Sequence, residues 1–201
     1  SKLKDVIAKC KSNNMPNDTI NNAIKRAAGA SNSENYEEIT YEGYGPSGVA
    51  IIVETLTDNV NRAFTEVRSA FTKCGGTIGT NGCVSYMFTK YAVIEFTGKS
   101  EDEALEILLE AGVDVIDAST DEEGYVRVLA EPSALEAMEQ AFAAAGINEF
   151  DTDEVKLIPS DEVVLTDEKL VKFERLLDML DEVDDVQKVY HNVKLPEVTE
   201  E

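Results

Sequence analysis

Cationic side chains are scarce in this sequence of 201 residues. The chain carries 18 Lys and Arg against 40 Asp and Glu, and its formal net charge is −22 at pH 7. A protein that coats nucleic acid by displacing counterions from phosphate needs a basic surface. The composition therefore argues against the wrapping of a long duplex.

Histidine and cysteine are also rare. One His and three Cys, without paired spacing, offer neither a zinc-binding pattern nor a disulfide framework. His191 has no partner at catalytic spacing, and the carboxylates are scattered over predicted helix faces. We therefore expect no metal, no cofactor and no catalytic site.

Long apolar runs are missing as well. No run approaches the roughly 20 residues that span a bilayer, and the first residues lack the apolar core of a signal peptide. We expect no membrane partner and a cytoplasmic location, or the mitochondrial matrix if the source is eukaryotic.

The charge is distributed unevenly along the chain. Residues 1–35 hold six basic and three acidic side chains, whereas residues 88–159 hold four basic and eighteen acidic ones. Such asymmetry suits an oriented binder that turns its acidic face away from phosphate or towards a basic protein partner.

Residues 1–35 predict two short helices and a polar linker. Apolar residues recur at helical spacing on both sides of Pro16, which suits a first helical turn, and Gly29 ends the second helix. Two such helices cannot form a stable domain alone, so they are the remnant of a truncated helical domain or pack on the next one. Their basic side chains are either nucleic-acid contacts or solvated helix faces: Lys9, Lys11, Lys25 and Arg26.

Residues 36–88 predict strand, turn, strand, helix, loop and strand. The first glycine loop (residues 43–48) precedes a β-branched run, and Asp58 or Asn59 can cap the next helix. The second glycine loop (residues 79–82) is expected to be flexible and to lead into a strand at 84–88.

Residues 88–159 predict a complete βαββαβ unit. Ser100 and Glu103 form a capping box in its first helix, and strands are expected near 91–97, 113–117, 125–129 and 151–158. Residues 36–87 contain only one helix, and a helix after Thr166 and a strand at 186–193 supply the elements that this segment lacks. We therefore predict an α+β protein with an N-terminal helical remnant (residues 1–35) and two ferredoxin-like α/β units. Residues 36–87 plus 160–201 form a split unit into which residues 88–159 are inserted, with hinges near Lys90 and Pro159.

The two glycine loops are the first candidate sites. The first could cradle phosphate through backbone amides or be a plain hairpin turn, and the exposed aromatic expected at its tip favours RNA or a ribosomal crevice. The predicted contacts are Tyr44, Gly45, Pro46, Gly48, Gly79, Thr80, Asn81 and Gly82.

The start of the helix after residue 59 is the second candidate site. Asn61 and Arg62 lie there, and Arg62 either contacts phosphate or pairs with Glu66 four residues on.

Several segments, in order, resemble the YebC family, which includes mitochondrial translational activators of cytochrome oxidase. They are MPNDTINNAIKRA, EEITYEGYGPSGVAIIVE, LTDNVNR and CGGTIGTNGCVSYMF. Family members usually begin with a basic segment like HSKW…IK…K, and this chain starts after it, which removes part of the expected nucleic-acid surface.

The resemblance implies a non-enzymatic regulator of gene expression, acting through DNA or through the ribosome. The acidic body argues against wide duplex wrapping and favours the ribosome or RNA, with ribosomal RNA as the expected partner and DNA as the close rival. A small-molecule sensor or protein adaptor built on ferredoxin-like units is the alternative from a different class.

Overall fold

The computed structural model describes residues 2–29 and 36–196 and divides into two units, Ser1–Tyr36 and Glu37–Glu201. The first unit holds helices α1 (Lys2–Ser12) and α2 (Asn17–Gly29), which confirms the two predicted helices. The predicted linker at residues 30–35 lies outside the described residues.

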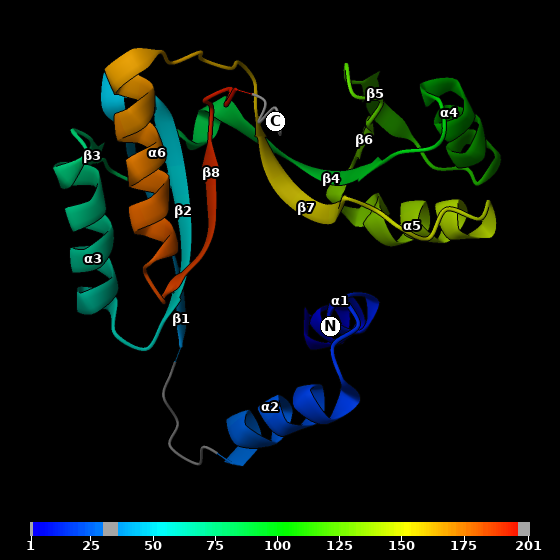
Figure 1. The fold of residues 1–201 in the computed structure, drawn as a ribbon, viewed down its shortest axis with the longest axis horizontal. Helices are drawn as coiled ribbons and strands as arrows, with labels where there is room; N and C mark the ends of the chain where they lie inside the picture. Colours follow the sequence, from blue (N-terminus) through cyan, green and yellow to red (C-terminus); the bar gives the residue numbers. More distant parts are fainter. Residues whose placement is uncertain (1, 30–35, 197–201) are drawn as a thin grey trace. The chain divides into compact units, whose positions relative to one another are not determined.

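The second unit contains two four-stranded antiparallel sheets (Figure 1). In the first sheet the strand order is β3-β1-β2-β8, and two helices pack on one face. Its elements are β1 (Glu37–Tyr44), β2 (Ala50–Thr57), α3 (Val60–Lys73), β3 (Thr77–Ile78), α6 (Asp167–Asp181) and β8 (Val186–His191). The core between sheet and helices contains Val53, Phe71, Phe173 and Leu176. Residues more than 100 positions apart in the sequence therefore pack into one core.

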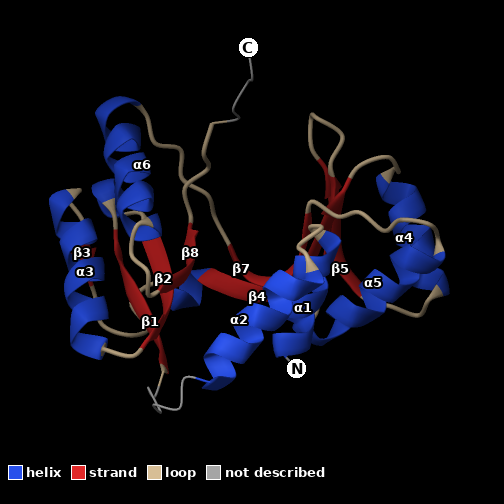
Figure 2. Cartoon of the chain, turned by 60° about the horizontal axis from the view of Figure 1, so that its bottom comes forward, coloured by secondary structure: helices blue, strands red, loops and turns tan. Residues whose placement is uncertain are grey.

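The second sheet has the order β5-β6-β4-β7, and the chain runs through it as strand, helix, strand, strand, helix, strand, as in a ferredoxin-like unit. Figure 2 shows the helices of this unit beside its sheet. Its elements are β4 (Phe88–Phe96), α4 (Glu101–Glu110), β5 (Val115–Thr120), β6 (Val126–Ala130), α5 (Leu135–Ala144) and β7 (Thr152–Pro159). Ser100 and Glu103 form the predicted capping box. The mixed α+β class with two sheet units is confirmed.

The chain crosses between the sheets at two adjacent points. The Ser160 N–H donates to the Met87 carbonyl at 2.8 Å, and Phe88 pairs with Pro159. Lys90, where we predicted a hinge, lies inside β4 and pairs with Leu157. The two crossings are therefore joined by hydrogen bonds at the ends of β4 and β7.

Contacts between the sheets are both apolar and charged. Ala50 and Ile52 of β2 cluster with Val84 and Phe88. The Lys188 ammonium of β8 lies 2.6 Å from the Glu154 carboxylate of β7.

The strand predicted at residues 84–88 is wrong. Ser85–Met87 is a single 3-10 turn, Phe88 already belongs to β4, and the strand of the first sheet is Thr77–Ile78, before the second glycine loop. The physical reason is that the amides of Val84 and Ser85 bind a side chain instead of a neighbouring strand.

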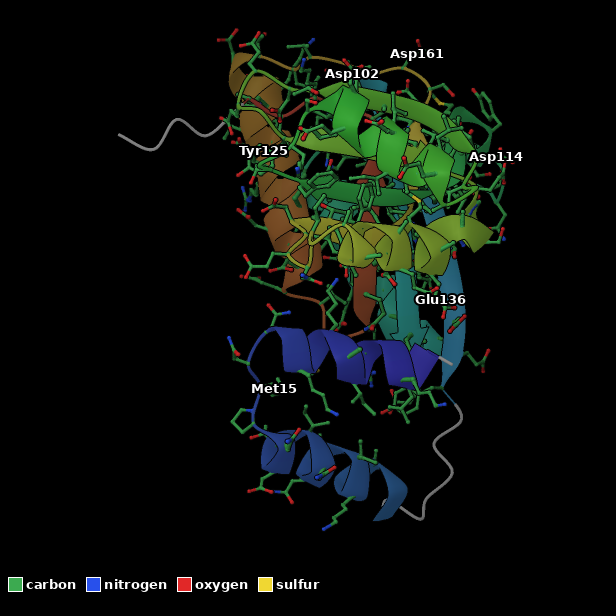
Figure 3. The ribbon with its side chains drawn as sticks, turned by 90° about the vertical axis from the view of Figure 1, so that its right-hand side faces the viewer. Met15, Asp102, Asp114, Tyr125, Glu136 and Asp161 are labelled. Atoms are coloured by element: carbon green, nitrogen blue, oxygen red, sulfur yellow. The ribbon has the colours of Figure 1, made fainter. Side chains whose placement is uncertain are left out.

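Acidic side chains cover the helices of the second sheet. Asp102 of α4 and Glu136 of α5 are both exposed, and Figure 3 shows these side chains together with Asp114 on that unit. Helix α4 carries five of the eighteen acidic side chains of residues 88–159 and α5 carries two, and the others lie on the strands and loops of the second sheet.

Candidate nucleic-acid interface

The first glycine loop is the hairpin turn between β1 and β2. The Gly45 N–H donates to the Val49 carbonyl at 2.8 Å, and the Gly48 N–H donates to the Gly45 carbonyl at 3.0 Å. Ser47 and Gly48 have φ values of 64° and 77°, in the left-handed region that the turn requires. Tyr44 and Gly48 are exposed, whereas Gly45 and Pro46 are buried, so only part of the predicted loop surface is available for contact.

The second glycine loop is held against β1. The Gly79 N–H donates to the Glu42 backbone carbonyl at 2.8 Å, and the Cys83 N–H donates to the Thr80 carbonyl at 3.0 Å. Thr80, Asn81 and Gly82 are exposed, and Gly79 is half-buried. The loop that we expected to be flexible is therefore tied down by hydrogen bonds at both ends.

A direct hydrogen bond joins the two loops. The Tyr44 hydroxyl donates to the Cys83 carbonyl at 3.1 Å. Burial raises the pKa of the Tyr44 phenol, and the neighbouring Cys83, Tyr86 and Glu42 raise it further, so the hydroxyl stays protonated at neutral pH. The two loops thus form one surface, although Gly48 and Gly79 are 31 positions apart in the sequence.

Glu42 is the residue that sequence reasoning missed. Its carboxylate accepts N–H groups from Gly82 at 2.8 Å, Val84 at 3.0 Å and Ser85 at 2.9 Å. Burial alone raises the pKa of this carboxyl, but the three backbone hydrogen bonds outweigh burial and hold the pKa below its ordinary value. Successive residues of a strand point to opposite faces, and Glu42 follows the apolar Tyr41. The sequence pattern therefore predicts that Glu42 faces solvent, whereas its side chain is buried.

Tyr86 is a second residue that the sequence did not identify. It lies in the 3-10 turn Ser85–Met87, and 78% of its surface is exposed, compared with 37% for Tyr44. The incorrect strand prediction had placed it as an ordinary strand residue. The combined loop surface therefore presents two aromatic side chains to solvent.

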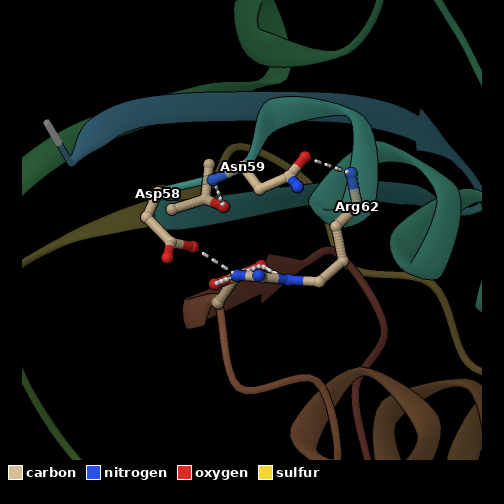
Figure 4. A network of polar contacts seen from close by, with 5 residues as sticks. Asp58, Asn59 and Arg62 are labelled. Carbon is tan, nitrogen blue, oxygen red and sulfur yellow. Dashed lines mark hydrogen bonds and ion pairs between the residues drawn. The ribbon is translucent and has the colours of Figure 1, made fainter. Parts of the chain in front are cut away.

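Arg62 is engaged in ion pairs within the unit. One Nη2 lies 2.6 Å from Asp58 Oδ1 and 2.8 Å from Asp185 Oδ1, and Nε donates to Asp185 Oδ2 at 3.2 Å (Figure 4). The hydrogen bonds that the guanidinium donates to Asp185 first, and then to Asp58, raise its pKa well above the ordinary range.

These partners correct the predicted alternatives for Arg62. The pairing with Glu66 is wrong, and contact with phosphate would require Arg62 to leave two carboxylates. Asn59 caps α3, as predicted, by accepting the Arg62 backbone N–H at 3.0 Å, and Asn61 is exposed in the first turn.

The predicted basic contacts belong to the N-terminal unit. Lys9 and Lys11 lie in the last turn of α1, and Lys25 lies in α2; all three are exposed. The side chain of Arg26 lies outside the described residues. The structure thus places these cations in a different unit from the glycine loops.

Other kinds of site receive no support from the described part of the chain. Within it, no group of three or more His, Cys, Asp and Glu side chains is arranged to hold a metal ion. None of the helices in residues 2–29 and 36–196 is long and apolar enough to cross a membrane. A shallow groove of about 550 Å³ lies between α3 and α6, and Glu66, Glu182 and Asp184 contribute carboxylates to its lining.

Comparison with known proteins places these features in a family. The family model described as the second and third domain of TACO1/YebC matches residues 36–193. A probable transcriptional regulatory protein of Clostridium beijerinckii is 52% identical over 199 residues, which cover 98% of this chain and 80% of that protein. A protein of the same description from Lachnospira eligens is 51% identical over 207 residues, which cover 100% of this chain and 81% of the relative.

A solved structure shares the fold. The crystal structure of a conserved hypothetical protein from Aquifex aeolicus aligns with a TM-score of 0.79 and 37% sequence identity, covering 97% of this chain and 80% of that chain.

Proposed function

This chain belongs to the TACO1/YebC family, and from that membership and the geometry of the glycine loops we propose that it is a non-enzymatic regulator of gene expression that binds nucleic acid. The observation that carries the proposal is the hydrogen bond from Tyr44 to Cys83, which unites the two loops into one surface with exposed aromatic rings. Exposed aromatic and polar groups on a firm backbone are what unstacked RNA bases require of a protein.

RNA, within the ribosome, is the favoured target. Exposed acidic side chains lie on α4, on α5 and on the loops of the second sheet, so a long duplex would meet repulsion over much of the body. A structured RNA crevice instead needs only a small contact made by the loops, and Lys11 and Lys25 of the N-terminal unit offer phosphate contacts of their own. The acidic surface would then face away from phosphate or towards a basic ribosomal protein.

DNA-dependent transcriptional regulation is the second candidate. It is favoured by the names of the relatives, which are described as probable transcriptional regulatory proteins. Under this candidate the N-terminal cations carry more of the binding, because duplex DNA hides the faces of its bases and presents phosphate.

Two measurements separate these candidates. We expect the protein to co-sediment with ribosomes at physiological salt. We also expect it to bind a 20-base-pair DNA duplex weakly, with a salt dependence of the binding constant that corresponds to fewer than about four phosphate contacts. Absence from the ribosomal pellet, together with tight and steeply salt-dependent duplex binding, would favour the DNA candidate. Failure to bind in both assays would refute nucleic-acid binding altogether.

A further inference from the structure

The second glycine loop contains backbone amides that converge as they do in anion-binding sites. Successive N–H groups in a glycine-rich turn form a concavity that ordinarily binds phosphate or another anion. Here Gly82, Val84 and Ser85 direct their N–H groups at one point, and the Glu42 carboxylate occupies it. The protein therefore supplies its own anion to this site.

We propose that the joined loops bind an unpaired nucleobase by stacking on Tyr44 and Tyr86, and that Glu42 positions this surface by filling the amide site of the second loop. This inference rests on the proposed function and specifies which part of the nucleic acid is recognised.

Phosphate is a poor ligand for the loop amides. Glu42 is only 7% exposed, so an incoming phosphate would have to expel a buried carboxylate that already has three hydrogen bonds. The lowered pKa of Glu42 keeps the carboxylate ionised at neutral pH, which maintains its competition with any other anion. The amides of Gly82, Val84 and Ser85 therefore have a structural role. We expect the exposed side chains of the joined loops to recognise the nucleic acid.

The two tyrosines suit a base. Tyr86 follows directly after Ser85, whose N–H is bound by Glu42, so the carboxylate fixes the start of the turn that carries this ring. The Tyr44 hydroxyl is bound to Cys83, which restrains the second ring. Base stacking on an aromatic side chain is sequence-tolerant, and it requires a base whose face is free, which duplexes do not offer.

The test uses the full chain and three fluorescein-labelled 12-nucleotide probes. One is an unstructured single-stranded RNA, one is the same RNA with four central abasic positions, and one is a blunt RNA duplex. We expect the wild type to prefer the first probe over both others by about tenfold or more.

Variants assign the preference to residues. Tyr44→Ala and Tyr86→Ala should each weaken binding of the single strand about ten- to a hundredfold and abolish discrimination against the abasic probe. Tyr36→Ala removes another exposed tyrosine, 58% exposed and outside both loops, and should leave both quantities unchanged.

Glu42→Gln tests positioning rather than contact. It should reduce discrimination between the intact and abasic RNA, and amide hydrogen exchange should speed up at Gly82, Val84 and Ser85. Because loss of the carboxylate can also impair folding, Tyr44→Phe serves as a second variant. It keeps the ring and removes only the hydrogen bond to Cys83, so it should lower affinity severalfold while keeping the preference for bases.

The outcomes distinguish the two levels of proposal. If the wild type binds none of the probes, no ribosomes and no DNA duplex, the proposed function fails. If it binds all three probes equally, or if the tyrosine variants bind as the wild type does, base stacking is refuted while nucleic-acid binding stands. If a folded Glu42→Gln protein discriminates as well as the wild type, the positioning role of Glu42 is refuted.

Discussion

His191, the single histidine of the chain, is held in an apolar site on β8. Its ring packs edge-on against Phe173 with 5.0 Å between centroids, and the Val193 N–H donates to its Nδ1 at 3.2 Å. Burial lowers the pKa of the imidazole below its ordinary value, although the Glu162 carboxylate opposes this effect. The folded protein therefore binds this proton more weakly than the unfolded chain does.

We predict that His191 makes stability fall as the solution is acidified through the ordinary histidine pKa of about 6.5, because the pKa of the folded protein is lower. Because one proton is involved, the slope cannot exceed about 1.4 kcal/mol per pH unit. The NMR titration of the only histidine gives its pKa directly, and His191→Gln should flatten the profile measured by urea unfolding. A titration midpoint at or above about 6.5 would contradict the prediction.

Arg62 makes a second residue-scale prediction. Arg62→Ala leaves Asp185, which is 5% exposed, without its cation and should destabilise the fold by about 1–3 kcal/mol. The control is Arg68→Ala on the same helix; this side chain lies 6.0 Å from the Phe64 ring and is exposed, so we expect a change below about 0.5 kcal/mol. Urea unfolding of the two variants measures the difference, and equal effects would show that the network adds nothing.

At the scale of elements, β1, β3 and α3 approach one another closely at Gly43. A Cβ added there would lie 2.5 Å from the Thr77 carbonyl oxygen and 2.8 Å from the Phe71 ring. We predict that Gly43→Ala destabilises the protein by about 1–3 kcal/mol because backbone and a buried ring must move. Thr40→Ala, at an exposed position of the same strand, should change the unfolding free energy by less than about 0.5 kcal/mol. Equal midpoints in urea would refute the close packing.

The elements that local patterns specify were predictable, and those that depend on distant partners were not. Helical periodicity and caps identified α4 and α3, because the capping box of Ser100 and the Asn59 cap are contained within a few residues. The strand error at residues 84–88 arose because the partner of these amides, Glu42, lies about 40 residues earlier. Arg62 likewise meets Asp185 at a separation of 123 residues.

The candidate site divides in the same way. Glycine and proline content located both loops, and Tyr44 was identified as exposed. That the loops meet follows from the pairing of β1 with β3, which sets Tyr44 opposite Thr77, and no local signal encodes this register. Tyr86 and Glu42 therefore emerged only from the structure.

At the scale of the whole molecule, the charge asymmetry acquires a structural meaning. The acidic side chains of residues 88–159 lie on α4 and α5 and also on the strands and loops of the second sheet, among them Asp117, Asp121 and Glu149, whereas the glycine loops belong to the first sheet and its connection to β4. The unit that carries the proposed contact surface is thus not the unit that carries most of the charge. Under the proposed function, this separation would let an acidic protein approach nucleic acid through one restricted surface.

The proposed domain boundaries lead to a final prediction. The core of the second sheet is drawn entirely from residues 88–159, including Ile94, Phe96, Leu108, Val128 and Phe142. The ends of this segment are adjacent, since Phe88 pairs with Pro159, so excision leaves two neighbouring termini. We predict that residues 88–159 expressed alone unfold in one cooperative transition. This segment loses the ion pair between Lys188 and Glu154 and the apolar contacts of Phe88 with Ala50, Ile52 and Val84.

The matched comparison is residues 36–87 expressed alone. This segment has the same order of length but lacks α6 and β8, so Phe173, Leu176 and Leu180 no longer cover the first sheet. We expect it to show neither a cooperative transition nor a native-like circular dichroism spectrum, because a sheet that keeps α3 but loses α6 and β8 leaves part of its apolar face uncovered. Cooperative folding of residues 36–87, or its absence in residues 88–159, would overturn the division into a split and an inserted unit.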